Sequence, residues 1–158
     1  GMPVSAVLGT KEVMDLYGPG EMTSTHSANP VCSAAALASL RVLREEGLIE
    51  NTARLAPVLA EGAKAVAAVS NGKVGRVGGV GLVAAIQFTQ PGTTNPDPDT
   101  AWEIVKRAYQ RGVLLFAPVG CGGCCVKLCP PLVITEPQVR EGLGVLAEIA
   151  AEVTSKNV

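Results

Sequence analysis

Residues 23–30, with the sequence TSTHSANP, form a hydroxyl-rich stretch whose chemistry suits a phosphate group. The stretch leads into an Ala-rich segment that opens with Asn29-Pro30, a pair typical of a helix amino terminus. Free backbone N–H groups, the positive end of a helix dipole and hydroxyl donors together favour an anion. Each hydrogen bond to a phosphate contributes about 1.5–3 kcal/mol net. An ordinary capping loop has the same pattern, and on the pattern alone it is the commoner explanation.

A single lysine, Lys127, lies in an apolar stretch that ends in Pro130-Pro131. A lysine in such a strand either extends its ammonium group into solvent along the apolar surface or meets an anion. The pattern by itself favours extension into solvent, so that an anion site at this position needs further support.

Four of the five cysteines lie close together in the chain, namely Cys121, Cys124, Cys125 and Cys129. Thiolates bind zinc and iron–sulfur clusters, but a four-thiolate zinc site usually joins two separated pairs. Strand alternation would also send neighbouring cysteines to opposite faces. The pattern therefore favours small apolar side chains in a tight turn over a metal site. The glycines of residues 75–81 lack the following helix and acidic residue of a dinucleotide-binding loop.

The amino-acid composition of the chain limits the classes of function that it could have. Of 158 residues, 47% are hydrophobic and only 17% are charged, which predicts apolar surface that is buried by oligomerisation or against something larger. A net charge of -1 without a basic cluster argues against nucleic-acid binding. We find no apolar run that could span a membrane and no signal peptide. An odd number of crowded cysteines favours a reducing, cytoplasmic setting over a secreted disulfide framework.

Hydrophobic periodicity, with glycine and proline breaks, predicts the elements that would position these residues. The residues from Thr135 to Gln138 have the spacing of a capping box and should begin the last helix. We expect strands over 4–10, 73–77, 82–89, 113–117 and 125–129, and helices over 11–17, 30–46, 48–70, 99–111 and from 135 onward. This order predicts an α+β layer whose small, mostly antiparallel sheet is covered by helices on one side.

Five stretches, taken in order, resemble the class III pyridoxal-phosphate aminotransferases, a family that includes the ornithine and 4-aminobutyrate aminotransferases. Residues 1–7 look like the segment after the family's Schiff-base lysine, and 24–30 look like its cofactor-phosphate loop. Residues 45–51 look like its helix junction, 77–82 like the glycine-rich start of its small domain, and 127–135 like its final strand and cap. The resemblance covers nearly the whole chain.

The resemblance implies the carboxy-terminal portion of a fold-type-I enzyme, with an α/β architecture. Residues 1–71 would end the large domain and supply connecting helices, and 72–158 would form the small domain. The implied cofactor is pyridoxal 5'-phosphate, the implied assembly a homodimer, and the implied substrates an amino acid or amine and a 2-oxo acid. Ser24 and Thr25 would bind the cofactor phosphate, with Thr25 reaching the cofactor of the neighbouring subunit. Lys127 falls where several members bind the substrate carboxylate with arginine, and a lysine lacks that bidentate fork.

The resemblance also implies that the Schiff-base lysine would lie just before Gly1. Lys11 does not fit that role, because the whole opening segment separates it from the expected position. The chain opens in mid-pattern, as a cut chain would. We therefore expect a carboxy-terminal fragment that does not transaminate alone, since the chemistry needs that lysine. Two alternatives stay open: a free-standing interaction domain that keeps the fold without a cofactor, and a metal- or redox-binding protein that uses the cysteines of 121–129.

Overall fold

The structure is a computed structural model that describes residues 2–21 and 23–155. The chain divides into two compact units, Gly1–Leu48 and Ile49–Val158, which we call the N-terminal and C-terminal units. None of the helices within the described residues combines the length and apolar character needed to cross a membrane.

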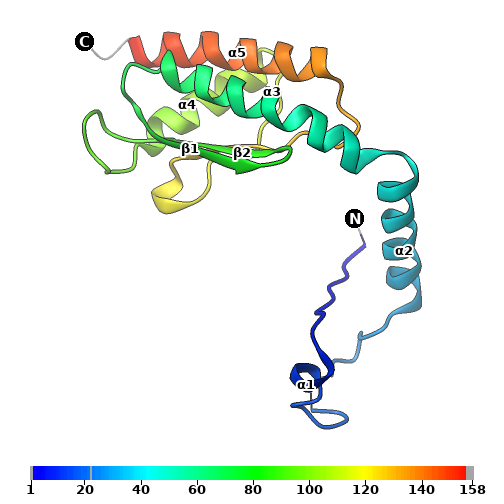
Figure 1. The fold of residues 1–158 in the computed structure, drawn as a ribbon. Helices are drawn as coiled ribbons and strands as arrows, with labels where there is room; N and C mark the ends of the chain where they lie inside the picture. The colour runs from blue at the N-terminus through cyan, green and yellow to red at the C-terminus, as the bar shows by residue number, and fades with distance from the viewer. Residues whose placement is uncertain (1, 22, 156–158) are drawn as a thin grey trace. The chain divides into compact units, whose positions relative to one another are not determined.

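The N-terminal unit contains a short helix α1 (Lys11–Met14) and a longer helix α2 (Pro30–Glu45), shown in blue and cyan in Figure 1. Helix α2 begins where the sequence predicts. The Asn29 side-chain oxygen accepts hydrogen bonds from the backbone N–H groups of Val31 and Cys32, at 3.0 and 3.1 Å. Proline occupies the first helical position, where its missing N–H costs nothing.

The strand predicted over 4–10 is wrong, because these residues have no regular secondary structure. The described part of the N-terminal unit contains no strand that could pair with them. A strand needs a neighbour to bond its backbone groups, and an apolar sequence alone does not supply one. Leu8 is consequently 94% exposed and Val7 is exposed beside it.

The C-terminal unit carries a three-stranded antiparallel sheet in the order β1-β2-β3, with helices on one side (Figure 1). Its elements are α3 (Leu48–Ala68), β1 (Val74–Val80), β2 (Val83–Phe88), α4 (Pro98–Gln110), the short 3-10 turn η1 (Cys121–Gly123), β3 (Cys125–Leu128) and α5 (Glu136–Ser155). The predicted small antiparallel sheet with covering helices is confirmed. At the start of α5, Gln138 accepts the backbone N–H of Thr135 at 3.0 Å, as in one half of a capping box.

The core lies between the sheet and these helices. Alternate residues of β2, Ala84, Ile86 and Phe88, are buried toward the helices, and Val126 and Leu128 of β3 are buried with them. Each large apolar side chain removed from water in this way contributes about 1.5–3 kcal/mol. The fully buried helical partners include Leu55, Val66, Ile104 and Ile149.

The strand predicted over 113–117 is also wrong. The segment follows α4 without regular structure, and only Val119 forms an isolated bridge, with Cys125. Its side chains still alternate as in a strand: Leu115 packs against the core, whereas Leu114 and Phe116 are 80% and 57% exposed. The sequence is suited to a strand, but within the described residues no partner strand lies beside it.

A buried ion pair joins the start of the sheet to α4. The Lys73 ammonium lies 3.1 Å from an Asp97 carboxylate oxygen and donates to the Thr100 hydroxyl, also at 3.1 Å. Both charged side chains are less than 9% exposed. Asp97 in turn caps α4 by accepting the Thr100 backbone N–H at 3.1 Å. No buried side-chain nitrogen or oxygen of this cluster lacks a hydrogen-bond partner, so the fold tolerates two buried charges.

We expect Asp97→Asn to lower the free energy of unfolding by about 3–5 kcal/mol, measured by urea denaturation. Asparagine caps helices as well as aspartate does, so the variant mainly removes the charge opposite the buried Lys73 ammonium. The matched control is Glu148→Gln, which breaks the exposed pair with Arg111 and should cost less than about 1 kcal/mol. Equal losses in both variants would contradict a special role for the buried pair.

The same carboxylate should make the C-terminal unit sensitive to acid. Burial raises the pKa of Asp97, but hydrogen bonds from Thr100 and Lys73 outweigh it and hold the pKa below its ordinary value of 3.8. The stabilisation is therefore fully present above the ordinary value and is lost as pH falls through the lowered one. Urea midpoints measured from pH 6 downward should fall more steeply below about pH 4 in the native sequence than in Asp97→Asn. Parallel curves would show that Asp97 does not carry the effect.

Candidate functional site

The hydroxyl-rich loop forms a compact turn ahead of α2. The Ser24 and Ser27 hydroxyl oxygens lie 3.1 Å apart, and the Ser24 backbone N–H donates to the Ser27 hydroxyl at 3.1 Å. The Ser27 backbone N–H donates to the Ser24 carbonyl, also at 3.1 Å. Ala28, which follows, has a φ of 54°, an unusual left-handed conformation for a residue other than glycine. This turn brings the loop to the helix entrance at Asn29.

The loop retains free hydroxyl donors, although two of the first backbone N–H groups of α2 already have an acceptor. Asn29 accepts two of the first N–H groups of α2, which leaves the helix terminus a weaker anion site than the sequence predicts. Thr25 is exposed, and no hydrogen bond within the described residues uses its hydroxyl. If the Ser27 hydroxyl donates to the Ser24 hydroxyl oxygen, the Ser24 hydroxyl proton is also free to donate to a ligand. The two predicted residues, Ser24 and Thr25, thus fit a phosphate group through side-chain donors.

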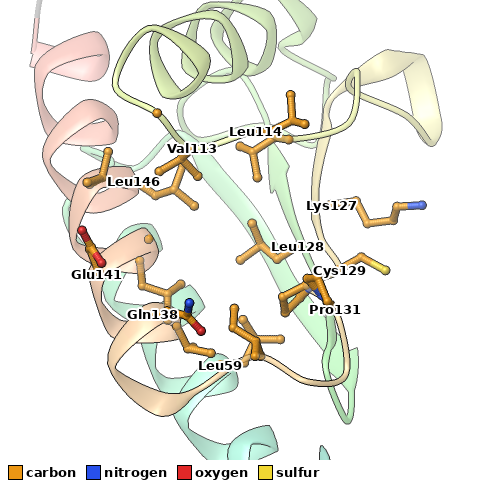
Figure 2. A pocket seen from close by; sticks show the side chains of 18 of the residues that line it. Leu59, Val113, Leu114, Lys127, Leu128, Cys129, Pro131, Gln138, Glu141 and Leu146 are labelled. Atoms are coloured by element: carbon orange, nitrogen blue, oxygen red, sulfur yellow. The ribbon is translucent and has the colours of Figure 1, made fainter. Parts of the chain in front are cut away.

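A cleft of about 420 Å³ opens beside β3 in the C-terminal unit (Figure 2). Its walls are residues 111–116, the end of β3, the turn 129–131 and the first half of α5. Figure 2 shows Leu128 pointing into the cleft and Lys127 pointing away from it, as alternation along a strand requires. Most of the lining is apolar, including Leu59, Leu115, Val139 and Leu146.

Lys127 stands at the edge of this cleft. Its ammonium lies 4.5 Å from the centre of the Phe116 ring, a cation–π contact worth about 0.5–1 kcal/mol at an exposed site. No ion pair within the described residues involves Lys127. Its three donors therefore stay available to an anion. Sequence reasoning missed Phe116 because nothing in its expected strand indicates contact with a lysine 11 positions later.

The other lysines have different surroundings. Lys73 is sealed in its ion pair with Asp97. Lys11 pairs with Asp15 and Lys106 with Glu103, both at the surface, and Lys64 is exposed on α3. Lys156 lies outside the described residues. None of Lys11, Lys64, Lys73 and Lys106 lines the cleft beside β3.

The cysteines separate as strand alternation predicts. Cys124 is buried, Cys125 is half-buried and Cys129 is exposed. Among the residues whose side chains the structure describes, no group of three histidine, cysteine or acidic side chains could hold a metal ion. The side chain of Cys121 lies outside that set.

Comparison with known proteins places this geometry in a family. The class-III aminotransferase family model matches residues 1–150. The 4-aminobutyrate aminotransferase of Mycobacterium tuberculosis is 32% identical over 152 residues, which are 96% of this chain and 33% of that protein. The 4-aminobutyrate aminotransferase GabT of Escherichia coli is 34% identical over 94% of this chain and 34% of its own length.

Solved structures agree. Ornithine delta-aminotransferase of Plasmodium falciparum matches 96% of this chain and 36% of its own, with a TM-score of 0.78 and 28% identity. The present chain spans about a third of the length of the relatives it matches. Sequence and fold together show that the chain belongs to the class-III aminotransferase family.

Proposed function

We propose that this chain is the carboxy-terminal part of a pyridoxal-phosphate aminotransferase, which moves an amino group between an amino acid or amine and a 2-oxo acid. The observation that carries the proposal is the family match over residues 1–150, which includes both the hydroxyl-rich loop and Lys127. In this proposal residues 1–71 end the large domain and 72–158 form the small domain. The compact units divide earlier, after Leu48, because α3 packs with the sheet.

Ser24 and Thr25 would hold the phosphate of the cofactor through their hydroxyl groups. Pyridoxal phosphate, when bound, supplies an electron sink for the carbanion that forms at the substrate carbon. Hydrogen bonds to a phosphate contribute about 1.5–3 kcal/mol each, so one threonine hydroxyl has a measurable effect on cofactor affinity. By its resemblance to the family, Thr25 would reach the cofactor of the neighbouring subunit. We therefore propose a homodimer in which each copy completes the site of the other.

Lys127 would hold the substrate carboxylate. Lys127 is half-buried, forms no ion pair with a described acid, and holds its ammonium over the Phe116 ring. A lysine binds a carboxylate as a point charge, whereas an arginine offers a planar fork. We therefore expect looser orientation of the carboxylate here than in relatives with arginine at this position.

The chain alone would not transaminate: of its described lysines, Lys11, Lys73 and Lys106 are held in ion pairs, Lys64 is exposed, and Lys127 is the one proposed for the substrate carboxylate. The alternative of a free-standing interaction domain is less well supported. Leu8, Leu114 and Phe116 are largely exposed apolar side chains, which fit a part that packs against more of its own fold.

Treatment of the purified chain with pyridoxal phosphate and borohydride should label its lysines sparsely and without preference. Borohydride fixes the cofactor to any lysine that carries it, and mass spectrometry then locates the label. Escherichia coli GabT, treated in parallel, serves as the full-length control. Stoichiometric labelling of one lysine in this chain would contradict the proposed inactivity.

A chimera tests the phosphate loop in a complete enzyme. In it, this chain replaces the matching carboxy-terminal third of GabT, and we expect the product to bind pyridoxal phosphate and transaminate. Thr25→Val should weaken cofactor binding about tenfold or more, because one charge-assisted hydrogen bond is lost. Thr25→Ser should restore it, and Thr23→Val, the same change two residues earlier, should have little effect. A chimera without cofactor binding would contradict the proposed function, and equal effects of the two valine variants would exclude Thr25 as the donor.

A further inference from the structure

A tight turn at Asn71-Gly72 joins α3 to β1 in the C-terminal unit. The Lys73 backbone N–H donates to the Ser70 carbonyl at 2.9 Å and closes the turn. Asn71 and Gly72 have φ values of 47° and 73°, in the left-handed region that asparagine and glycine adopt more readily than other residues. Both residues are exposed, and a Cβ added to Gly72 would meet no atom within 4 Å. Solvent therefore reaches both sides of the peptide bond that joins them.

The two residues carry the groups for an intramolecular reaction of the asparagine side chain. The nucleophile is the Gly72 backbone nitrogen, which makes no hydrogen bond to the described residues, and glycine has no side chain to block its approach. Its attack forms a bond from this nitrogen to Asn71 Cγ and breaks the Cγ–Nδ2 bond. The proton of the Gly72 N–H leaves with Nδ2 as ammonia. Water then opens the cyclic imide at either carbonyl, which gives aspartate or isoaspartate.

A hydrogen bond to α5 restrains the amide that would react. Asn71 Nδ2 donates to the Thr154 hydroxyl oxygen at 3.1 Å, and the Thr154 hydroxyl donates to the Ala150 carbonyl at 2.7 Å. Thr154 is buried in the last turn of α5, and Ser70 and Lys73 on either side of the turn are buried as well. Neither the acceptor nor the flanking backbone can follow the Asn71 side chain. Rotation of the side chain toward the Gly72 nitrogen therefore costs the hydrogen bond to Thr154.

We propose that Asn71 is a deamidation site and that Thr154 controls the rate of the reaction. The product has a carboxylate in place of the amide, and this carboxylate faces a hydroxyl oxygen whose proton is already donated to Ala150. It also lies beside the carboxyl end of α5, where the helix dipole disfavours negative charge. Aspartate or isoaspartate at position 71 therefore loses the contact with Thr154. Deamidation thus releases the α3–β1 turn from the end of α5.

The test is an incubation of the full chain at mildly alkaline pH, followed by digestion and mass spectrometry of the asparagine-containing peptides. Asn29 and Asn95 are internal controls, because proline follows each of them and has no N–H that could attack. We expect acid to accumulate first at Asn71, with part of the product as isoaspartate, which a protein isoaspartyl methyltransferase labels. Conversion no faster than at Asn29 and Asn95, or a product without isoaspartate, overturns the site.

Two substitutions of Thr154 test its control of the rate. Thr154→Val keeps the size of the side chain but removes the acceptor, so conversion at Asn71 should be about two- to tenfold faster, the effect of one lost hydrogen bond. Thr154→Ser keeps the hydroxyl and should keep the native rate. Asn51 reports general unfolding, because its amide donates to the Leu132 and Ile134 carbonyls at 2.7 and 3.1 Å. Equal rates in the two variants, or a rise at Asn51 that matches the rise at Asn71, overturns control by Thr154.

Discussion

Side-chain alternation along β2 governs the rest of the C-terminal unit. Ala84, Ile86 and Phe88 are buried against α3, α4 and α5, and this burial fixes the register of the whole sheet. The same period of two turns the intervening residues Val83, Ala85 and Gln87 to the face of the sheet that the helices do not cover. A slip of one residue would place the core residues in solvent and bury Gln87. Because β3 pairs in register with β2, the position of Lys127 follows from the burial of its neighbours Val126 and Leu128.

The buried pair of Lys73 and Asp97 adds a polar constraint to this apolar one. Hydrophobic contact alone would allow α4 to shift along the sheet, since apolar surfaces impose little direction. An ammonium that must meet one carboxylate and one hydroxyl allows a single position for the start of α4. The cost of burying two charges is offset by the hydrogen bonds that Lys73, Asp97 and Thr100 make with one another. Burial and polar contacts thus fix the β1–α4 junction together.

The helices could be predicted from the sequence because their signals are local. Asn29 begins α2 and the capping residues at Thr135 begin α5, each through contacts within three positions. A strand depends on residues elsewhere, and the apolar pattern of 4–10 resembles that of 82–89 although only the latter finds a neighbour. The Lys73–Asp97 pair joins residues 24 positions apart in the chain, and no periodicity in the sequence predicts that they meet. Ser24, Thr25 and Lys127 are proposed as site residues through their resemblance to a family, which substitutes for that missing long-range information.

The two candidate groups of the site are built independently. Local hydrogen bonds within the N-terminal unit shape the loop around Thr25, and sheet register within the C-terminal unit sets Lys127. Neither group depends on the other for its conformation, so in the proposed enzyme each would bring its own anchor to the reaction centre. Amino-group transfer requires phosphate and carboxylate anchors at fixed distances from one reacting carbon. In the proposed dimer, further parts of the fold and the second subunit would meet that requirement.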